Sequence, residues 1–281
     1  MFAVRWKQGL AGGVLSSAPL EAANHAGPDT VITYEYPLNE RICTLLRLED
    51  LFGRIAHFSH SDEAHAHHSA LLATFEVLEV ASRADLKVDL VQELERQRQI
   101  LLSFRNNPEI SEEALAGALY EIEQSSAALL AMAGKIGQYL RENEWLMAIK
   151  SRAAIPGGAC EFDLPSYHFW LNRDPELRRV DLEHWLGPIV PIRDGLTIVL
   201  RLLRASGRPE AQRAPRGVYQ LMMAGRTVQM IRVRIARGIS AVPEISANKY
   251  ALNIRFMLPE TVSRPRQTDV DVNFELTFCN L

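Results

Sequence analysis

The sequence predicts an α+β fold, in which a large all-helical domain is joined to a smaller antiparallel β domain. From Pro37 to Ala153, apolar residues recur at steps of three and four, which is the spacing along one face of a helix. After Gly207-Arg208-Pro209 the period falls to two, which is typical of half-buried strands. The chain has 281 residues, of which 47% are hydrophobic, and this is enough for two cores.

Residues 1–32 are predicted to form a flexible N-terminal tail. Arg5 and Lys7 precede small residues, as in a secretion signal, but glycine and serine interrupt the apolar stretch that a signal requires. No run in the chain approaches the roughly 18 apolar residues that a membrane-spanning helix needs. We therefore expect no secretion and no membrane partner.

Residues 33–153 together with 166–206 are predicted to form the helical domain. Pro37 suits a first helical turn, and Asn106-Asn107-Pro108 stops a later helix. The stretch His57–His68 interrupts the apolar pattern and is predicted to contain a loop or a helix junction. The apolar faces of the expected helices run over residues 38–55, 71–80, 90–104, 111–133, 135–152, 177–186 and 189–203.

Residues 207–281 together with 154–165 are predicted to form the β domain. Alternation is clear in TVQMIRVRIAR, KYALNIRFML and VDVNFELTF, so one face of each strand should be buried and the other solvated. Tyr250 and Val270 fall on the predicted inner faces. The basic residues that fall on the predicted outer faces are Arg232, Arg234, Lys249 and Arg255.

The stretch AIPGGACEFDLPSYHFWL, residues 154–171, is predicted to connect the two domains. Gly157-Gly158 follows a helix and a proline, which favours a tight turn over a phosphate-binding loop. The short alternating segment Ala159–Asp163 is predicted to contribute one strand to the β domain. Pro165 is then suited to the first turn of the next helix.

An enzymatic or metal-binding role is not expected from the reactive side chains. Cys160 and His168 are the nearest nucleophile–base pair, but a small buried cysteine and a histidine packed beneath aromatic rings are the favoured interpretations. A hydrolase that uses this pair remains the third alternative. The histidines with a spacing that matches no closed metal site are His57, His60, His65, His67 and His68. Three widely separated cysteines favour a reducing, cytoplasmic compartment, and we expect no cofactor.

The net charge of −3 is distributed unevenly along the chain. Residues 201–266 contain 13 Lys and Arg against three Glu, so this segment carries +10 and the rest of the chain −13. Cross-strand pairs with Asp271 and Glu275 could neutralise only part of this charge. The surplus predicts a basic surface for an acidic partner. Nucleic acid is the alternative partner, but the strands show neither an aromatic stacking platform nor a recognised binding motif, so an acidic protein segment is favoured.

Four sequence blocks together resemble the ZapD family of Z-ring-associated cell division proteins. The blocks are YEYPLNERICTLLRLEDL (34–51), KIGQYLRENE (135–144), IPGGACEFDLPSYHFWL (155–171) and ISANKYALNIRFM (245–257). The resemblance implies a helical domain with a β domain, and a cytoplasmic, non-enzymatic homodimer at the mid-cell division site. It also implies that the protein binds the acidic C-terminal tail of FtsZ, the bacterial tubulin homologue, and cross-links FtsZ filaments, which stabilises the Z-ring.

The resemblance implies a basic pocket for that tail, near the junction of the two domains. Arg83, Lys249 and Arg255 match basic residues of the pocket. Arg47 and His168 match other charged or polar positions that matter for the function of the family.

Two positions depart from the family pattern. This chain has Ala251 where relatives carry arginine, and Glu144 where they carry a basic residue. We therefore hypothesise that Arg232 or Arg234 supplies the missing contact with the tail.

Overall fold

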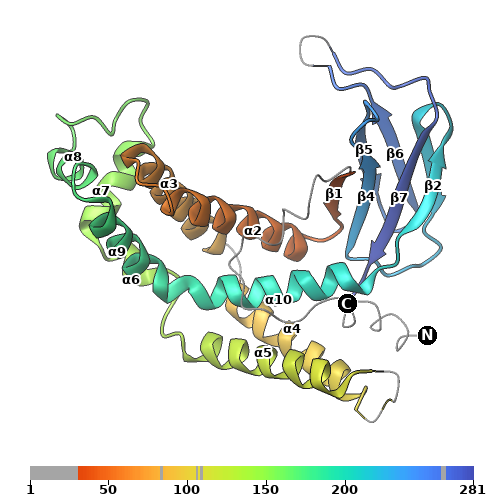
Figure 1. Ribbon diagram of the computed structural model, residues 1–281, viewed down its shortest axis with the longest axis horizontal. Helices are drawn as coiled ribbons and strands as arrows, with labels where there is room; N and C mark the ends of the chain where they lie inside the picture. The colour runs from red at the N-terminus through yellow and green to blue at the C-terminus, as the bar shows by residue number, and fades with distance from the viewer. Residues whose placement is uncertain (1–30, 83–84, 106, 108–109, 261–263) are drawn as a thin grey trace. The chain divides into compact units, whose positions relative to one another are not determined.

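The computed structural model describes residues 31–82, 85–105, 107, 110–260 and 264–281 (Figure 1). The predicted N-terminal tail, apart from Val31 and Ile32, lies outside these residues. The chain forms two compact units, which are described here one at a time. The β unit comprises the described residues of 1–43, 107–111 and 201–281, and the helical unit those of 44–106 and 112–200. The predicted α+β class is confirmed.

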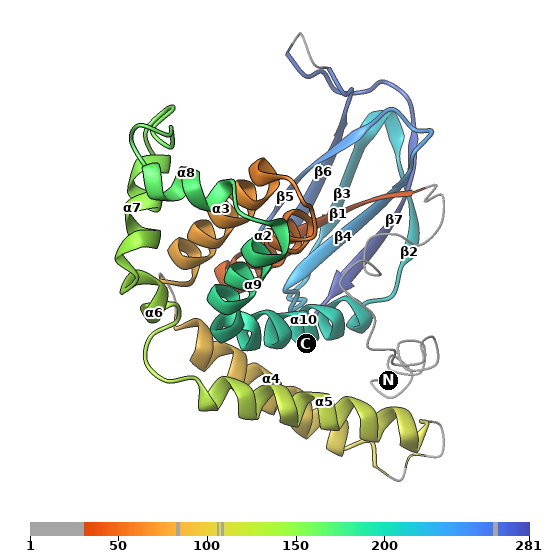
Figure 2. The same ribbon diagram turned by 60° about the vertical axis from the view of Figure 1, so that its left-hand side comes forward.

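The helical unit is built from eight helices that lie wholly or mostly within it and from most of α10. These elements are α2 (Glu40–Ser59), α3 (Ala64–Ala81), α4 (Leu86–Leu102), α5 (Glu112–Ala131), α6 (Gln138–Arg141), α7 (Glu144–Ala153), α8 (Pro165–Leu171), α9 (Pro175–Leu186), the short 3-10 helix η2 (Gly187–Ile189) and α10 (Val190–Ser206). Helices α4 and α5 form an antiparallel pair that lies side by side in both views (Figures 1 and 2). Helix α3 packs against α7, α8 and α9.

Local sequence signals account for several helix starts. Asn143 caps α7, because its side-chain oxygen accepts a hydrogen bond from the backbone N–H of Leu146 at 3.0 Å. Asp174 caps α9 by accepting from the N–H of Glu176 at 2.9 Å. Pro165 begins α8 as predicted, because proline at the first helical position loses no intrahelical hydrogen bond.

An aromatic cluster anchors α8 in the core of the helical unit. Trp145, Tyr167, Trp170 and Trp185 form this cluster, with neighbouring ring centroids 5.6 to 6.1 Å apart. The Tyr167 hydroxyl lies 2.7 Å from Nδ1 of His68 on α3. Burial raises the pKa of this hydroxyl, which therefore stays protonated. The short helix α8 is thus fixed by its inward side chains.

A buried arginine joins α9 to the start of α3. Arg178 is 4% exposed, and its Nε donates a hydrogen bond to Nδ1 of the fully buried His67 at 3.0 Å. Its two terminal nitrogens donate to the carbonyl oxygens of Leu171 and Asp62. Because His67 accepts at Nδ1, its imidazole must be neutral in this arrangement. Burial, and then the charge of Arg178, lower the pKa of His67.

This arrangement predicts that acid destabilises the helical unit. A histidine with a lowered pKa in the folded state binds its proton more readily in the unfolded state, where the pKa is about 6.5. The free energy of unfolding should therefore be constant above that pH and fall as the pH decreases from about 6.5. Urea unfolding of the wild type and of His67→Gln between pH 7.5 and 5.5 measures this slope. A wild-type slope no steeper than that of His67→Gln would contradict the prediction.

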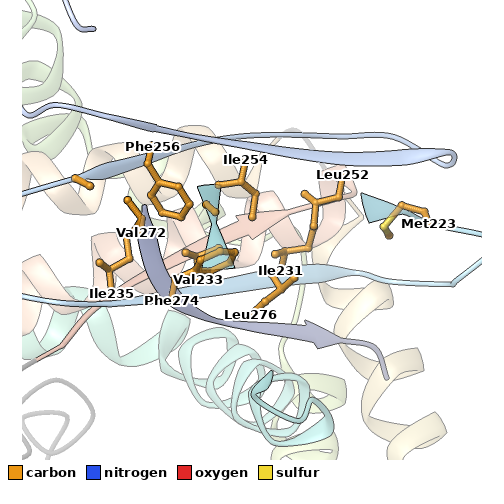
Figure 3. Close-up of a cluster of buried hydrophobic side chains, with 12 residues drawn as sticks. Met223, Ile231, Val233, Ile235, Leu252, Ile254, Phe256, Val272, Phe274 and Leu276 are labelled. Carbon is orange, nitrogen blue, oxygen red and sulfur yellow. The ribbon is translucent and has the colours of Figure 1, made fainter. Parts of the chain in front are cut away.

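The β unit contains two antiparallel sheets that face each other. Its strands are β1 (Val31–Pro37), β2 (Glu210–Ala214), β3 (Val218–Met222), β4 (Met230–Ala236), β5 (Val242–Ala247), β6 (Ala251–Met257) and β7 (Val272–Cys279). The four-stranded sheet has the order β1-β4-β7-β2, and the three-stranded sheet has the order β3-β6-β5. Alternate residues of β4, β6 and β7 fill the space between them, as Figure 3 shows for Val233, Ile254 and Phe274. The alternation predicted for these strands is confirmed.

The last helix ends where the helical pattern of the sequence stops. Helix α10 ends at Ser206, and Gly207 leads toward β2. A Cβ at position 207 would lie 2.3 Å from Cγ2 of Thr277 and 2.7 Å from the carbonyl oxygen of Phe278. The backbone therefore passes too close to β7 for any residue other than glycine.

Several sequence predictions are wrong. Ala159–Asp163 is not a strand but a series of turns within the helical unit, because Asp163 and Leu164 both donate their backbone N–H to the carbonyl of Cys160. Val31–Pro37, expected to be tail and helix, is a strand paired along its whole length with β4. Tyr250 and Val270, expected in the core, are 64% and 60% exposed, because each lies in a bend outside the regular strands.

The helix junction predicted within the histidine-rich stretch is confirmed. His57 belongs to α2, and His65, His67 and His68 belong to α3, so only a short connection between the two helices is irregular.

Candidate partner-binding surface

Arg255 lies on the outer face of the three-stranded sheet. It is the fifth residue of β6, where Leu252, Ile254 and Phe256 point into the core, so its own side chain points to solvent. On either side it pairs in register with Val218 of β3 and Glu244 of β5. Its guanidinium lies 3.7 Å from the Glu244 carboxylate, and the two side chains are 64% and 51% exposed. Such an exposed pair is weak, so Arg255 can exchange Glu244 for another carboxylate.

Lys249 lies at one end of the same face, in the turn between β5 and β6. Asn248 builds this turn, because its side-chain oxygen accepts hydrogen bonds from the backbone N–H groups of Tyr250 and Ala251 at 2.8 and 3.0 Å. The ammonium nitrogen of Lys249 lies 4.8 Å from the centroid of the exposed Tyr250 ring. No carboxylate of the described residues lies within ion-pair distance of Lys249.

Between these two cations the sheet face is uncharged, with the exposed Met222 beside Ala251 in one row and polar side chains in the next. Gln220 of β3, Asn253 of β6 and Ser246 of β5 form one cross-strand row there. Arg255 is the fifth residue of β6, whereas Lys249 lies in the turn two residues before this strand begins. We call this surface, from Lys249 through Asn253 to Arg255, the outer face of the three-stranded sheet. It can accommodate an extended acidic segment that meets one cation near each end.

Arg232 lies on the other sheet and is held in a partly buried ion-pair cluster. Its Nε lies 2.9 Å from one Glu35 oxygen, and Arg204 of α10 donates to both oxygens of the same carboxylate at 2.8 and 2.7 Å. Burial alone would raise the pKa of Glu35, but the two guanidiniums outweigh it and hold this pKa below its ordinary value. The Arg232 side chain is only 26% exposed. The positive charge of Arg232 is therefore neutralised within the protein by the Glu35 carboxylate.

Arg234, two residues further along β4, pairs with Glu275 of β7 at 2.8 Å. The cross-strand neutralisation considered from sequence is thus present at this position. Arg213 pairs with Asp271 in the same way. Both Arg232 and Arg234 belong to the four-stranded sheet, whereas Lys249 and Arg255 belong to the three-stranded sheet, so their outward side chains leave opposite faces of the β unit. A single small site cannot contain all four residues.

A basic surplus nevertheless remains on the β unit. Among its described residues, six exposed cations have no carboxylate within 4 Å, and these are Arg208, Arg216, Arg226, Arg237, Lys249 and Arg264. Ion pairs within the β unit therefore neutralise only part of the positive charge counted from the sequence.

The remaining predicted site residues are not on the β unit. Arg47 is exposed on α2, and His168 is exposed on α8, where its Nε2 lies 3.7 Å from the Glu161 carboxylate. Arg83 lies outside the described residues. Glu144, one of the two departures from the family pattern, is exposed in the first turn of α7, where a negative charge stabilises the helix.

The expected environments of the possible nucleophile and base are wrong. Cys160 is exposed rather than buried, because its turn lies on the surface, and its thiol donates to the carbonyl of Gly157 at 2.8 Å. His168 is not packed beneath aromatic rings, because Tyr167 and Trp170 fill the inner face of α8. No hydrogen bond joins Cys160 to His168 within the described structure. Within the same residues, no three His, Cys, Asp or Glu side chains are grouped as metal ligands would be.

Sequence reasoning missed two residues that shape the surface. Glu35 was not singled out, because its partners Arg204 and Arg232 are about 170 to 200 residues away in the chain and no local pattern links them. Tyr250 was assigned to the core, although Asn248, two residues earlier, is a turn residue and indicates that the alternation begins only after this turn.

Comparison with known proteins gives one consistent family. The family described as ZapD, cell division protein, matches residues 46–255. The Cell division protein ZapD of Azoarcus sp. (strain BH72) is 76% identical over 251 residues, which cover 89% of this chain and 100% of that protein. The proteins of the same name from Aromatoleum aromaticum and Dechloromonas aromatica are 74% and 67% identical over 89% of this chain, and are covered over 98% and 100% of their own lengths. In the part of the chain that the structure describes, no helix has the length and apolar character needed to cross a membrane. The chain belongs to the ZapD family of cell division proteins.

Proposed function

We propose that this protein binds the acidic C-terminal tail of FtsZ and cross-links FtsZ filaments as a homodimer, which stabilises the Z-ring at mid-cell in the cytoplasm. Membership of a cell division family supports this role. The observation that carries the proposed binding site is the presence of Lys249 and Arg255 on one exposed sheet face, where Lys249 has no carboxylate partner and Arg255 has only a weak one.

The chemistry of this face fits an acidic, extended peptide. The Arg255 guanidinium can form bidentate hydrogen bonds to a carboxylate, and Lys249 adds a second cation in the turn between β5 and β6. A tail that contacts both would replace the exposed Glu244 contact at little cost. Each such contact is weak and sensitive to salt, because both partners remain close to water.

Bundling follows from the number of tails and binding surfaces. A filament displays one tail on every subunit, and a homodimer presents two outer faces. Once one tail is bound, the second binding event is effectively intramolecular, so weak single contacts can give strong cross-linking. The proposal therefore needs both a tail-binding face and a dimer.

Charge reversal tests the proposed face directly. We expect the double variant Lys249→Glu, Arg255→Glu to weaken binding of a synthetic FtsZ tail peptide by at least about tenfold, since two favourable charge contacts become repulsive. Fluorescence titration at low and moderate salt measures this, together with co-sedimentation with filaments that carry or lack the tail. Both side chains are exposed, so the circular dichroism spectrum and melting temperature should stay close to those of the wild type.

The matched control is the double variant Arg208→Glu, Arg237→Glu, which makes the same charge change at two exposed positions of the same unit. It should bind the peptide with nearly wild-type affinity. Equal losses in both double variants would show that only net charge matters and would reject this face as the site. Binding that does not depend on the tail would reject the tail as the partner.

A further inference from the structure

The outer edge of β3 carries backbone groups that point away from its sheet. In the three-stranded sheet β6 is central, so β3 and β5 each have one free edge. Just after β3, the backbone N–H of Met223 donates to the carbonyl of Tyr250 at 2.7 Å. Because hydrogen-bonded and non-hydrogen-bonded pairs alternate along an antiparallel ladder, the next hydrogen-bonded residue of β3 is Leu221. Gln220 and Met222, on either side of it, therefore direct their N–H and C=O groups away from β6.

These edge groups have no partner in the part of the chain that the structure describes. Outside the β3–β6 ladder, no hydrogen bond involves the backbone of Gln220 or Met222. The carbonyl of Val218 points to the same side, whereas its N–H donates to the carbonyl of Pro215. Met222 is 71% exposed, while the adjacent Met223 points into the core (Figure 3). An unpaired and accessible strand edge of this kind can pair with another extended chain.

The opposite edge of the same sheet, along β5, is less suited to an added acidic strand. The N–H of Asn248 donates to the carbonyl of Ala251 at 3.0 Å, so by the same alternation the outward backbone groups of β5 include those of Pro243 and Ala247. Pro243 has no N–H to donate. Glu244 adds an exposed negative charge to this strand. Proline and charge are features that protect edge strands from pairing, and β3 carries neither.

Four cations surround the β3 edge. Arg216 lies two residues before β3 and Arg226 four residues after it, and both are among the exposed cations of the β unit that have no carboxylate within 4 Å. Arg255 pairs in register with Val218, the first residue of β3, so it lies at the same end as Arg216. Lys249 and Arg226 belong to the segments that precede β6 and follow β3, at the other end of the antiparallel pair.

Negative charge is smaller around this edge. Asp271 accepts the backbone N–H of Arg216 at 2.8 Å, but its carboxylate is already paired with Arg213. Glu210 and Asp269 are exposed carboxylates on neighbouring segments of the β unit. The balance around the edge is therefore positive, which favours an acidic segment over a neutral or basic one.

The sheet spacing brings the cations within reach of an added strand. Such a strand would lie about 5 Å from β3 and about 10 Å from β6. Its alternate side chains would leave the sheet on the face that carries Gln220 and Arg255. The long side chains of arginine and lysine can approach a carboxylate across that distance. Backbone pairing then supplies affinity and the cations select acidic side chains, as in other complexes in which a peptide extends a sheet.

We propose that the acidic tail binds as an additional β-strand along the outer edge of β3. Its backbone pairs with Gln220 and Met222, and its carboxylates face the four cations around the edge. This inference rests on the proposed function in taking the FtsZ tail as the partner, and it specifies the bound conformation of that tail.

Backbone N-methylation of the tail peptide tests the added strand without altering the protein. Synthetic tail peptides, each N-methylated at one successive residue, are titrated with the full-length protein by fluorescence. In an added strand every second N–H points to β3. Methylation should therefore weaken binding by at least about fivefold at alternate positions of one stretch and leave the positions between them nearly unchanged. Equal effects at successive positions, or no effect at any position, would overturn the inference.

Proline substitution tests which edge is used. Gln220→Pro removes one outward N–H at a strand edge, where proline is tolerated, and should weaken peptide binding by at least about fivefold. Gln220→Thr retains the N–H and should bind as the wild type does. The matched control Ala247→Pro makes the same change on the β5 edge and should also leave binding unchanged. If Gln220→Pro loses the circular dichroism signal of the wild type, Met222→Pro replaces it. Loss of binding in Ala247→Pro alone would place the strand on β5 and contradict the proposal.

The same titrations separate this inference from the proposed function. A wild type that does not bind the unmodified tail peptide would reject both. Binding that Lys249→Glu, Arg255→Glu weakens, but that Gln220→Pro and N-methylation leave unchanged, would support the proposed function and reject the added strand. A lower mass of Gln220→Pro in sedimentation equilibrium, with unchanged peptide affinity, would assign the β3 edge to a second copy of the chain and also overturn the inference.

Discussion

Arg232→Glu is expected to lower the free energy of unfolding of the β unit by about 3 kcal/mol, the scale for breaking a buried ion pair by replacing one partner. In the folded protein, the Glu35 carboxylate is 17% exposed and is shared by Arg204 and Arg232. A glutamate at position 232 would bring a second negative charge beside Glu35 and leave one guanidinium to balance two carboxylates. The cluster joins β1, β4 and the end of α10, so its loss affects three elements at once.

Arg234→Glu is the matched control, two residues away on the same strand. Its guanidinium pairs with Glu275, and the two side chains are 38% and 45% exposed, so solvent screens the repulsion that the substitution creates. The expected cost is about 1 kcal/mol or less. Chemical unfolding followed by far-ultraviolet circular dichroism compares the two variants. Equal stabilities would show that the Glu35 cluster contributes no more than a surface pair.

The pH dependence of the same cluster provides an independent check. Because the pKa of Glu35 is lowered in the folded state, the stability that it confers is present above its ordinary value of 4.5 and is lost as the pH falls below it. Arg232→Glu should reduce this acid sensitivity, whereas Arg234→Glu should leave it nearly unchanged.

These expectations replace the hypothesis that Arg232 or Arg234 supplies a missing contact with the FtsZ tail. Arg232 already has a carboxylate partner inside the protein, and Arg234 leaves the face opposite Lys249 and Arg255. A loss of FtsZ binding in Arg232→Glu would follow from lost structure in the β unit. Binding assays on this variant therefore need a stability measurement beside them.

Strands whose own residues alternate between apolar and polar were predictable from the sequence. In β4, β6 and β7, period-two patterning over seven or eight residues identified both the strand and its buried side. Strand β1 was missed because it is stabilised by β4, about 200 residues further along the chain, and because Pro37 favoured a helix start. Ala159–Asp163 was wrongly assigned because five residues are too few to distinguish alternation from a turn.

The site was predictable only in part for the same physical reason. Strand alternation correctly placed Arg232, Arg234 and Arg255 on outward faces, since that depends on neighbours in sequence. Whether an outward charge is already neutralised depends on residues far away in the chain, such as Glu35 and Glu275. Which strands share a sheet also depends on pairing between distant residues. This pairing puts Arg232 and Arg234 in a different sheet from Arg255, so the three arginines cannot form one site.

Arg178→Leu is expected to be the most destabilising single change in the helical unit, lowering its free energy of unfolding by about 3–5 kcal/mol. Leucine retains part of the volume but donates no hydrogen bond. The substitution would therefore leave the buried Nδ1 of His67 without its donor and would also remove the donors of two partly buried carbonyl oxygens, those of Leu171 and Asp62. Each buried acceptor that loses its partner costs about 1–3 kcal/mol.

Arg54→Leu on α2 is the matched control, because it makes the same chemical change at a position whose side chain is 42% exposed and pairs weakly with Glu76 at 3.4 Å. Its effect should be within about 0.5 kcal/mol. Urea unfolding at pH 7.5, followed by the fluorescence of the tryptophan cluster, compares both variants with the wild type.

Arg178→Leu should also flatten the dependence of stability on pH between 7.5 and 5.5, because without the guanidinium His67 can accept a proton at lower cost. A stable Arg178→Leu protein with the wild-type pH slope would mean that water replaces all three hydrogen bonds and that the arginine is dispensable for joining α9 to α3.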